Sequence, residues 1–226
     1  MRKYLVLSIL IIFVGAGIFA VTGLRQPTAI TAQDSESANR VSEEIGRKAI
    51  PDDDDTFTEE GLPKHTDRYD NYVYYFSIVI PPGLVGYSAP DPAPAHGVAV
   101  PLSKNPDTWV YAGAHYNASF LESLDEALDQ HLEWIKGRGT DIEVIRREHT
   151  FIQRLPAMRF AVRYKSKTSG RIKIEDQVIA FRPDREANTD MIYEATLYTT
   201  EDHYVNDVVA FEQIVKGWKL KRIPRV

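Results

Sequence analysis

The sequence predicts an α+β fold, with a mainly antiparallel sheet of about six strands and two principal helices laid against it. Short runs of aromatic and β-branched residues are separated by proline and glycine turns, and hairpins dominate their order, which favours antiparallel pairing. Two other segments place apolar residues at helical spacing and are bounded by residues typical of helix ends.

The composition of the 226-residue chain is that of a globular protein, with 43% hydrophobic and 26% charged residues. The absence of cysteine excludes a disulfide scaffold, a zinc ribbon, an iron–sulfur cluster and a thiol nucleophile. A net charge of −5 argues against a strongly basic nucleic-acid-binding protein, so we expect no nucleic acid among the partners.

The first 25 residues predict a signal peptide or an N-terminal membrane anchor. Arg2 and Lys3 precede an apolar run over residues 4–24, which is long enough to cross a bilayer as a helix. Because the positive charges at its start outweigh Arg25, the rest of the chain is expected outside the cytoplasm. A cleaved signal and a retained anchor both fit, so the predicted location is extracytoplasmic, either membrane-anchored or secreted/periplasmic.

Residues 26–71 predict an acidic, disordered tether between this segment and a globular domain over residues 72–226. The tether holds twelve acidic and five basic residues, and its large apolar residues follow neither the helix nor the strand period. Its Asp52–Asp55 run lacks the alternating spacing and the closing glutamate of an EF-hand, so we interpret it as a solvated spacer.

The globular part is predicted to begin with a strand over residues 72–80, which Pro81-Pro82-Gly83 ends. A proline-rich loop over residues 87–106 follows, interrupted by a short extended piece at residues 98–102. Residues 109–116 predict the next strand.

The clearest helix begins after Ser123, which forms a capping box with Glu126. Lys136 and Gly137 are predicted to end it, the first through its charge and the second through its freedom to turn left-handed. Its apolar stripe consists of Leu124, Ala127, Leu128, His131, Leu132 and Ile135.

Four further strands are predicted after this helix, at residues 141–147, 157–165, 171–181 and 191–199, the middle two joined as a hairpin. Thr200 is predicted to cap a second helix and Gly217 to end it. The apolar face of that helix consists of Tyr204, Val208, Phe211, Ile214 and Val215.

Several of these motifs occur together in one known family. They are Phe76-Ser77-Ile78 running into Ile80-Pro81-Pro82-Gly83, the capped helix after Ser123, the Leu155-Pro156-Ala157 strand entry, and the closing strand and helix from Tyr193 to Trp218. In order and spacing they resemble PsbP-like proteins over residues 72–220. The family pattern usually has a bulky aromatic residue where Leu84 stands and often a glycine where Arg154 stands.

The resemblance implies an α/β/α sandwich around an antiparallel sheet. Family members include an extrinsic subunit of the photosynthetic oxygen-evolving complex, a Ran-binding import factor and many exported bacterial proteins. It implies a role in binding or assembly, although similarity of fold does not transfer function.

No catalytic motif is recognisable. The sequence has no Gly-x-Ser-x-Gly, Ser-x-x-Lys, Walker or dinucleotide-binding pattern. His115 and His131 together with Glu133 are one conceivable metal site, and packed histidines are the alternative interpretation. We expect no catalytic residues, no metal and no cofactor.

One stretch is distinctly basic: residues 138–173 contain ten lysines or arginines and three acidic residues. Period two places Arg159, Arg163 and Lys165 on one face of their strand, and Arg171 and Lys173 are expected opposite them across the hairpin. We interpret these five residues as a candidate anion- or partner-binding surface. The alternative is an exposed edge hairpin kept soluble by its charge.

The sequence thus predicts an exported, membrane-tethered, non-enzymatic binding or assembly module of the cell envelope. Its partner is expected to be an envelope protein or an anionic polymer or lipid, and residues 4–24 contact the membrane. The hairpin and the loop over residues 87–106 are the predicted working surface. The alternative is a small extracytoplasmic hydrolase with a site beneath that loop, using His96, His115 and Asp107.

Overall fold

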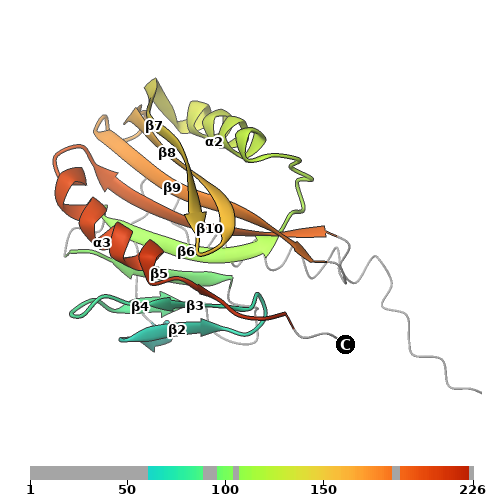
Figure 1. Cartoon of the computed structure of the whole chain (residues 1–226). Coiled ribbons are helices and arrows are strands. Elements are labelled where there is room, and N and C mark those ends of the chain that lie inside the picture. Colours follow the sequence, from blue (N-terminus) through green and yellow to red (C-terminus); the bar gives the residue numbers. More distant parts are fainter. Residues whose placement is uncertain (1–60, 89–95, 104–106, 185–188, 224–226) are drawn as a thin grey trace, which may run out of the picture.

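A computed structural model describes residues 61–88, 96–103, 107–184 and 189–223 (Figure 1). The predicted signal or anchor over residues 1–25 and most of the predicted tether lie outside the described residues. Within the described ranges, no helix has both the length and the apolar character needed to cross a membrane.

The main sheet has eight strands, and every neighbouring pair is antiparallel. In spatial order they are β1 (Lys64–His65), β4 (Gly86–Ser88), β5 (Gly97–Pro101), β6 (Trp109–Tyr116), β10 (Thr189–Thr200), β9 (Ile172–Asp184), β8 (Leu155–Ser166) and β7 (Gly139–Ile152). The antiparallel α+β prediction is confirmed, but the expected number of about six strands was too low. The strands β1 and β4 were missed because two or three residues show no period.

A second, three-stranded sheet consists of β11 (Lys219–Leu220), β3 (Phe76–Val79) and β2 (Arg68–Asn71), in that order. The strand predicted over residues 72–80 is confirmed only for Phe76–Val79, because residues 72–75 form a turn. The chain turns between β2 and β3, where Tyr75 adopts a φ of 54°. The strands β1 and β2 therefore lie before residue 72, within the range that was predicted as tether.

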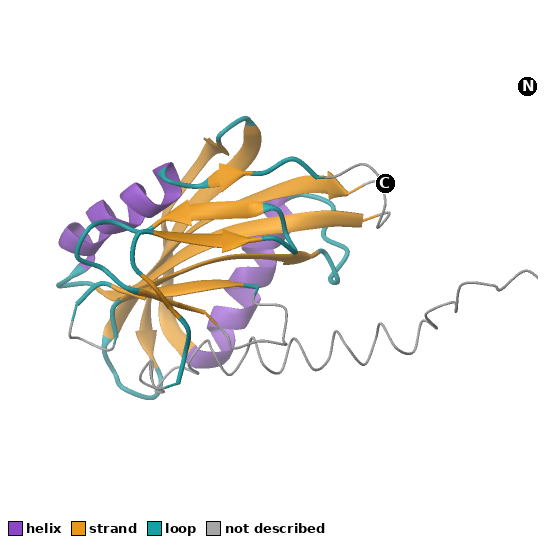
Figure 2. Cartoon of the chain, turned by 90° about the horizontal axis from the view of Figure 1, so that it is seen from below, coloured by secondary structure: helices purple, strands orange, loops and turns teal. Residues whose placement is uncertain are grey.

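The two helices lie on opposite sides of the main sheet (Figures 1 and 2). Helix α2 (Leu124–Arg138) packs on β7, β8 and β9, whereas α3 (Tyr204–Lys216) packs on β10 and β3. The layer that contains α3 also contains the small sheet, so one outer layer is mixed.

Strict alternation along β8 separates the two cores. Met158, Phe160, Val162 and Tyr164 are buried against α2. Ala157 belongs to the larger core on the other face, together with residues of α3 and the small sheet. This is the period-two pattern that the sequence shows over residues 157–165.

Helix α2 begins as predicted, since the Glu126 N–H donates to Ser123 Oγ at 3.2 Å. The Glu126 carboxylate, however, accepts from the Glu122 N–H at 2.7 Å instead of completing the capping box. The predicted end at Gly137 is wrong: the helix continues through Arg138 and is capped by Gly139. Gly139 is needed there because a Cβ would lie 2.5 Å from the Tyr164 ring.

Helix α3 begins at Tyr204 with His203 as its N-cap, so the predicted cap at Thr200 is wrong. The Thr200 carbonyl instead accepts from the His203 N–H at 3.0 Å, which forms a turn before the helix. The predicted end at Gly217 is confirmed, and Trp218 is buried in the same core as Ile214.

Candidate anion-binding pocket

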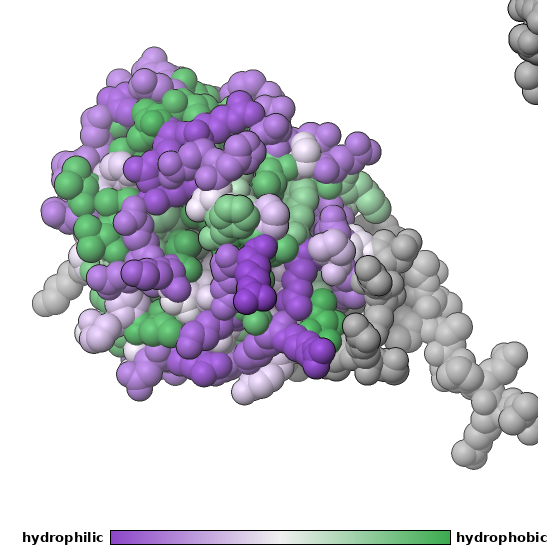
Figure 3. Space-filling view, viewed as in Figure 1, coloured by the Kyte–Doolittle hydropathy of each residue, from purple (hydrophilic) through white to green (hydrophobic). Residues whose placement is uncertain are grey.

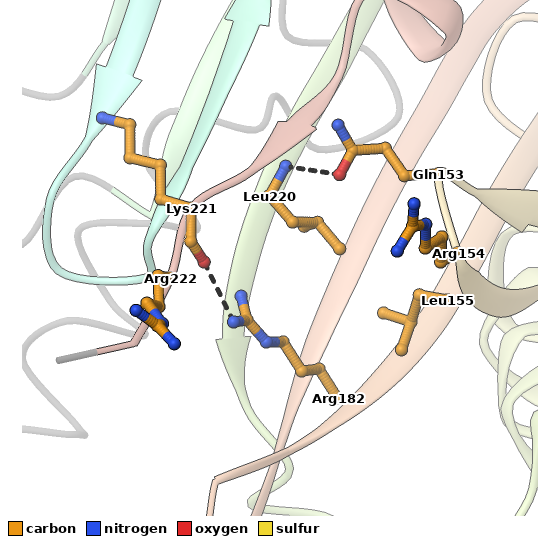
Figure 4. A pocket seen from close by; sticks show the side chains of 7 residues that line it. All are labelled: Gln153, Arg154, Leu155, Arg182, Leu220, Lys221 and Arg222. Carbon is orange, nitrogen blue, oxygen red and sulfur yellow. Dashed lines mark hydrogen bonds between the residues drawn. The ribbon is translucent and has the colours of Figure 1, made fainter. Parts of the chain in front are cut away.

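A basic pocket of about 810 Å³ lies where the turn between β7 and β8 meets the C-terminal segment (Figure 4). Three separate parts of the chain line it, and all but three of the lining residues are cationic. The lining residues are Gln153, Arg154, Leu155, Arg182, Leu220, Lys221 and Arg222.

The turn between β7 and β8 is held against β11 by one hydrogen bond. The Leu220 N–H donates to Gln153 Oε1 at 3.2 Å. Gln153 has a φ of 55°, which is uncommon for a residue with a side chain and costs conformational energy. The turn therefore places Arg154 at the pocket, in the position where the family pattern often has glycine.

Arg182 of β9 fixes the opposite side of the pocket. It donates from Nη2 to the Lys221 carbonyl at 2.9 Å and from Nη1 to the Tyr193 hydroxyl at 3.2 Å. The Tyr193 hydroxyl in turn donates to the Tyr74 carbonyl at 2.8 Å. The guanidinium of Arg182 is thus positioned by the main sheet and by the C-terminal segment together.

Lys221 lines the pocket with its backbone, and its ammonium points away (Figure 4). Lys221 Nζ lies 2.7 Å from Asp70 Oδ1 and 4.0 Å from the centre of the Tyr72 ring. Burial alone would raise the pKa of Asp70, but hydrogen bonds from Lys221 and Arg68 lower it. The charge of Lys221 is therefore compensated outside the pocket.

The other three cations are not compensated at the pocket. No carboxylate lines it, and neither Arg154 nor Arg222 forms an ion pair with a described residue. Three guanidiniums therefore surround Leu155 and Leu220. Guanidiniums bind phosphate or carboxylate oxygens through paired N–H groups, so this arrangement suits an anion with an apolar portion.

Three residues of the predicted basic surface lie on β8. Arg159, Arg163 and Lys165 share one face of β8, as period two requires. Arg159 donates from Nε and Nη2 to Asp176 at 2.9 and 2.8 Å and from Nη1 to Glu212 at 3.0 Å. Burial lowers the pKa of Arg159, but the hydrogen bonds to Asp176 raise it overall, so this guanidinium stays charged.

Acidic side chains also compensate Arg163 and Arg171. Arg163 donates from Nε to Glu201 at 2.7 Å, and Arg171 donates to Asp107. A second hollow near Arg171 is lined by both signs of charge, including Glu201 and Asp202.

The five predicted residues do not form one basic face. Lys173 pairs with Tyr164 in the register between β8 and β9. Tyr164 faces the α2 core, so Lys173 lies on the opposite face of the sheet from Arg163 and Lys165.

The conceivable metal site is not assembled. His115 Nε2 lies 3.7 Å from Glu194, and His131 Nε2 lies 3.3 Å from Glu175. Glu133 pairs instead with Lys136. Within the described ranges, no three histidine or carboxylate side chains lie close enough together to hold a metal ion.

The residues named for the hydrolase alternative are also separated. His96 Nδ1 lies 3.3 Å from the Ala114 carbonyl, near the end of β6 that holds His115. Asp107 precedes the start of β6, about 25 Å away along an extended strand. The structure therefore does not bring Asp107 to the two histidines.

Sequence reasoning missed the pocket because its arginines are far apart in the chain and follow no local pattern. The single available signal was Arg154, which replaces a frequent glycine of the family pattern. Arg182 and Arg222 carry no comparable signal, and only the fold brings them near Arg154.

The fold and the pocket define a small α+β module with a basic hollow. No protein-family model and no curated protein matches the chain. Among solved structures, it is similar to cyanobacterial PsbP (CyanoP) from Synechocystis, with 12% identity and a TM-score of 0.45. That match covers 70% of this chain and 93% of CyanoP.

Two further solved structures are similar at the same level. LpqN of Mycobacterium tuberculosis, which is involved in cell envelope biogenesis, has 10% identity and a TM-score of 0.40, covering 72% of this chain and 87% of LpqN. The Ran-binding protein Mog1p of Saccharomyces cerevisiae has 12% identity and a TM-score of 0.45, covering 71% of this chain and 96% of Mog1p. The predicted resemblance to PsbP-like proteins is confirmed as a remote similarity, which carries no statement about function.

Proposed function

We propose that this chain is a non-enzymatic binding or assembly module of the cell envelope, exported and tethered to the membrane through residues 4–24. In this proposal the module holds an anionic group of its partner in the basic pocket. The observation that carries it is the set of three guanidiniums from Arg154, Arg182 and Arg222, with no carboxylate among the lining residues. Like charges held close together repel one another, and a bound anion removes that repulsion.

The chemistry of the lining residues favours binding over turnover. Acid–base and nucleophilic catalysis need a side chain that exchanges a proton or attacks the substrate. The lining consists of arginine, lysine, glutamine and leucine only, and it contains no histidine, carboxylate, serine or threonine. The pocket can thus hold and orient an anion, which agrees with the binding role that the PsbP-like resemblance implies.

The predicted hairpin surface is a second proposed contact area, formed by Arg159, Arg163, Lys165, Arg171 and Lys173. Ion pairs with Asp176, Glu201 and Asp107 reduce the net charge near three of these residues. We therefore expect this surface to contribute less to anion binding than the pocket.

Calorimetric titration of the purified full chain with inorganic phosphate tests the pocket. Phosphate is expected to bind the wild type, and the double variant Arg154→Gln/Arg222→Gln is expected to bind several-fold more weakly. Arg147→Gln is the matched control, because Arg147 is exposed and lies outside both the pocket and the hairpin surface. Equal phosphate binding by all three proteins would contradict the proposal.

A screen with generic ester, phosphate and glycoside substrates tests the hydrolase alternative. We expect no turnover above that of a heat-denatured sample. Turnover that His115→Ala abolishes would show that the chain is an enzyme and would overturn the proposed function.

A further inference from the structure

Exposed apolar side chains lie at one edge of the basic pocket. In the turn between β2 and β3, Tyr72 is 75% exposed and Val73 is 49% exposed. Lys221 connects this turn to the pocket, since its N–H donates to the Tyr75 carbonyl at 2.7 Å and its Nζ lies over the Tyr72 ring. The pocket and the exposed turn are therefore parts of one surface region.

The other exposed aromatic residue near this turn faces away from the pocket. Phe151 is 65% exposed, but in the register between β7 and β8 its neighbour Ile152 pairs with Leu155 of the pocket, so Phe151 lies on the opposite face of the sheet. Figure 3 shows strongly hydrophilic side chains with apolar ones between them, where the C-terminal segment crosses the molecule in Figure 1. The arginines of the pocket and the exposed side chains of Tyr72 and Val73 thus occur together at this end of the domain.

A small soluble anion would compensate the arginines but would leave the side chains of Tyr72 and Val73 in water. A membrane surface accommodates both kinds of side chain, because aromatic rings favour the headgroup region and cations are attracted to anionic lipids. Leu155 and Leu220, which lie between the guanidiniums, can contact the glycerol and upper acyl region beneath a phosphate.

We propose that the anion bound by the pocket is the phosphate of an anionic phospholipid, and that this end of the domain lies on the bilayer surface. The inference rests on the proposed function, because it assigns a ligand class to the same pocket. Arg154 and Arg222 bind the phosphate, Arg182 is held in place beside it by its bonds to Lys221 and Tyr193, and Tyr72 enters the headgroup region.

The chain has no cysteine, so a single introduced cysteine can be labelled uniquely with a polarity-sensitive fluorophore. Val73→Cys reports on the exposed turn near the pocket. Thr168→Cys is the matched control, because it lies in the exposed turn between β8 and β9, at the opposite end of β8 from Arg154. Both labelled full-length chains are reconstituted in nanodiscs of phosphatidylcholine, with or without phosphatidylglycerol.

We expect a blue shift and protection from iodide quenching at position 73 in discs that contain phosphatidylglycerol, and neither effect at position 168. The Arg154→Glu/Arg222→Glu background should abolish both effects. An excess of inorganic phosphate at constant ionic strength should reverse them.

Failure of this inference is distinguishable from failure of the proposed function. If phosphate binds the wild type in calorimetry but position 73 is unchanged by phosphatidylglycerol, the ligand is a soluble anion and the lipid proposal is overturned. If phosphate does not bind either, both proposals are wrong. An equal response at positions 73 and 168 would reflect nonspecific adsorption and would also overturn the lipid proposal.

Discussion

Glu175 and Asp176 are neighbours in β9, yet their carboxylates lie on opposite faces of the main sheet, and both are buried. Glu175 accepts from Arg138, at the end of α2, and from the Tyr164 hydroxyl at 2.7 Å. Asp176 accepts from Arg159 and, at 2.7 Å, from the hydroxyl of Tyr204, the first residue of α3. One pair of acids therefore attaches both helices to the same strand.

Replacing Asp176 with alanine should destabilise the domain strongly. The substitution leaves the mostly buried guanidinium of Arg159 without its bidentate partner, which costs about 3–5 kcal/mol of unfolding free energy. Denaturant unfolding followed by circular dichroism measures this. Glu212→Ala is the control, since the Glu212 side chain is exposed and its pair with Arg159 is worth at most about 1 kcal/mol.

The double variant Arg159→Met/Asp176→Leu should regain much of the lost stability, because it leaves no unpaired charge in the interior. If Asp176→Ala unfolds at the same denaturant concentration as the wild type, the contacts of Asp176 with Arg159 and with Tyr204 of α3 do not stabilise the domain.

His131 should make stability depend on pH. Burial lowers the pKa of His131, Glu175 opposes this shift, and Arg138 adds to it. The unfolded chain therefore binds a proton at His131 more readily than the folded chain. Stability should fall as the pH drops below about 6.5, the pKa of an unfolded histidine, and should go on falling until the lowered folded pKa is passed.

The His131→Gln variant should reduce the pH slope of unfolding free energy in this window by up to about 1.4 kcal/mol per pH unit. Chemical denaturation between pH 5 and about pH 7.5 measures the slope. His65 and His96, whose pKa values are also lowered by burial, should retain part of it. An unchanged slope in His131→Gln would contradict the assignment, and His203→Gln serves as the exposed control.

Two glycine-to-alanine substitutions should have opposite effects. A Cβ at Gly97 would lie 2.4 Å from the Ala112 carbonyl oxygen and 2.6 Å from the Gly113 Cα, so Gly97→Ala should cost about 1–3 kcal/mol. Gly137 lies inside α2 with open space around it, so Gly137→Ala should stabilise by about 0.5–1 kcal/mol. Thermal unfolding compares them directly, and a loss of stability in Gly137→Ala would contradict the helical assignment of that residue.

The uncompensated charge of the pocket should be measurable without any ligand. The double variant Arg154→Gln/Arg222→Gln removes two of the cations that line the pocket. It should raise the unfolding free energy at low salt by up to about 1 kcal/mol, because the remaining like charges repel one another less. The difference in unfolding free energy between the variant and the wild type should shrink in about 0.5 M sodium chloride, because salt at this concentration screens charges that are more than a few ångströms apart. A variant less stable than the wild type at every salt concentration would show that these arginines are structural.

Regular, periodic segments of the sequence were sufficient to predict much of the fold. Residues 109–116 form β6 at the predicted bounds. The start of α2 was predictable because Ser123 caps the helix through a hydrogen bond to a residue only three positions away. The predicted end of α2 was wrong because the Tyr164 ring requires a glycine at position 139. This contact joins two elements that are distant in the sequence, so no local pattern indicates it.

The site was harder to predict than the fold, for two physical reasons. A charge run shows where cations are numerous but not whether acids from elsewhere meet them, and Asp176, Glu201 and Asp107 do so here. The pocket depends instead on Arg154, Arg182 and Arg222, which only the folded chain brings together.

Strand β11 pairs with β3 through Lys219 and Ser77, which are about 140 positions apart in the chain. Contacts between such distant segments form late, because a long loop must close before they gain any energy. The basic hollow borders this strand, so a nascent or trimmed domain that lacks residues 219–222 has no such hollow, even if its large sheet is complete. Anion binding therefore reports that β11 has paired with β3 and that the fold is complete. An affinity tag is better placed away from β11.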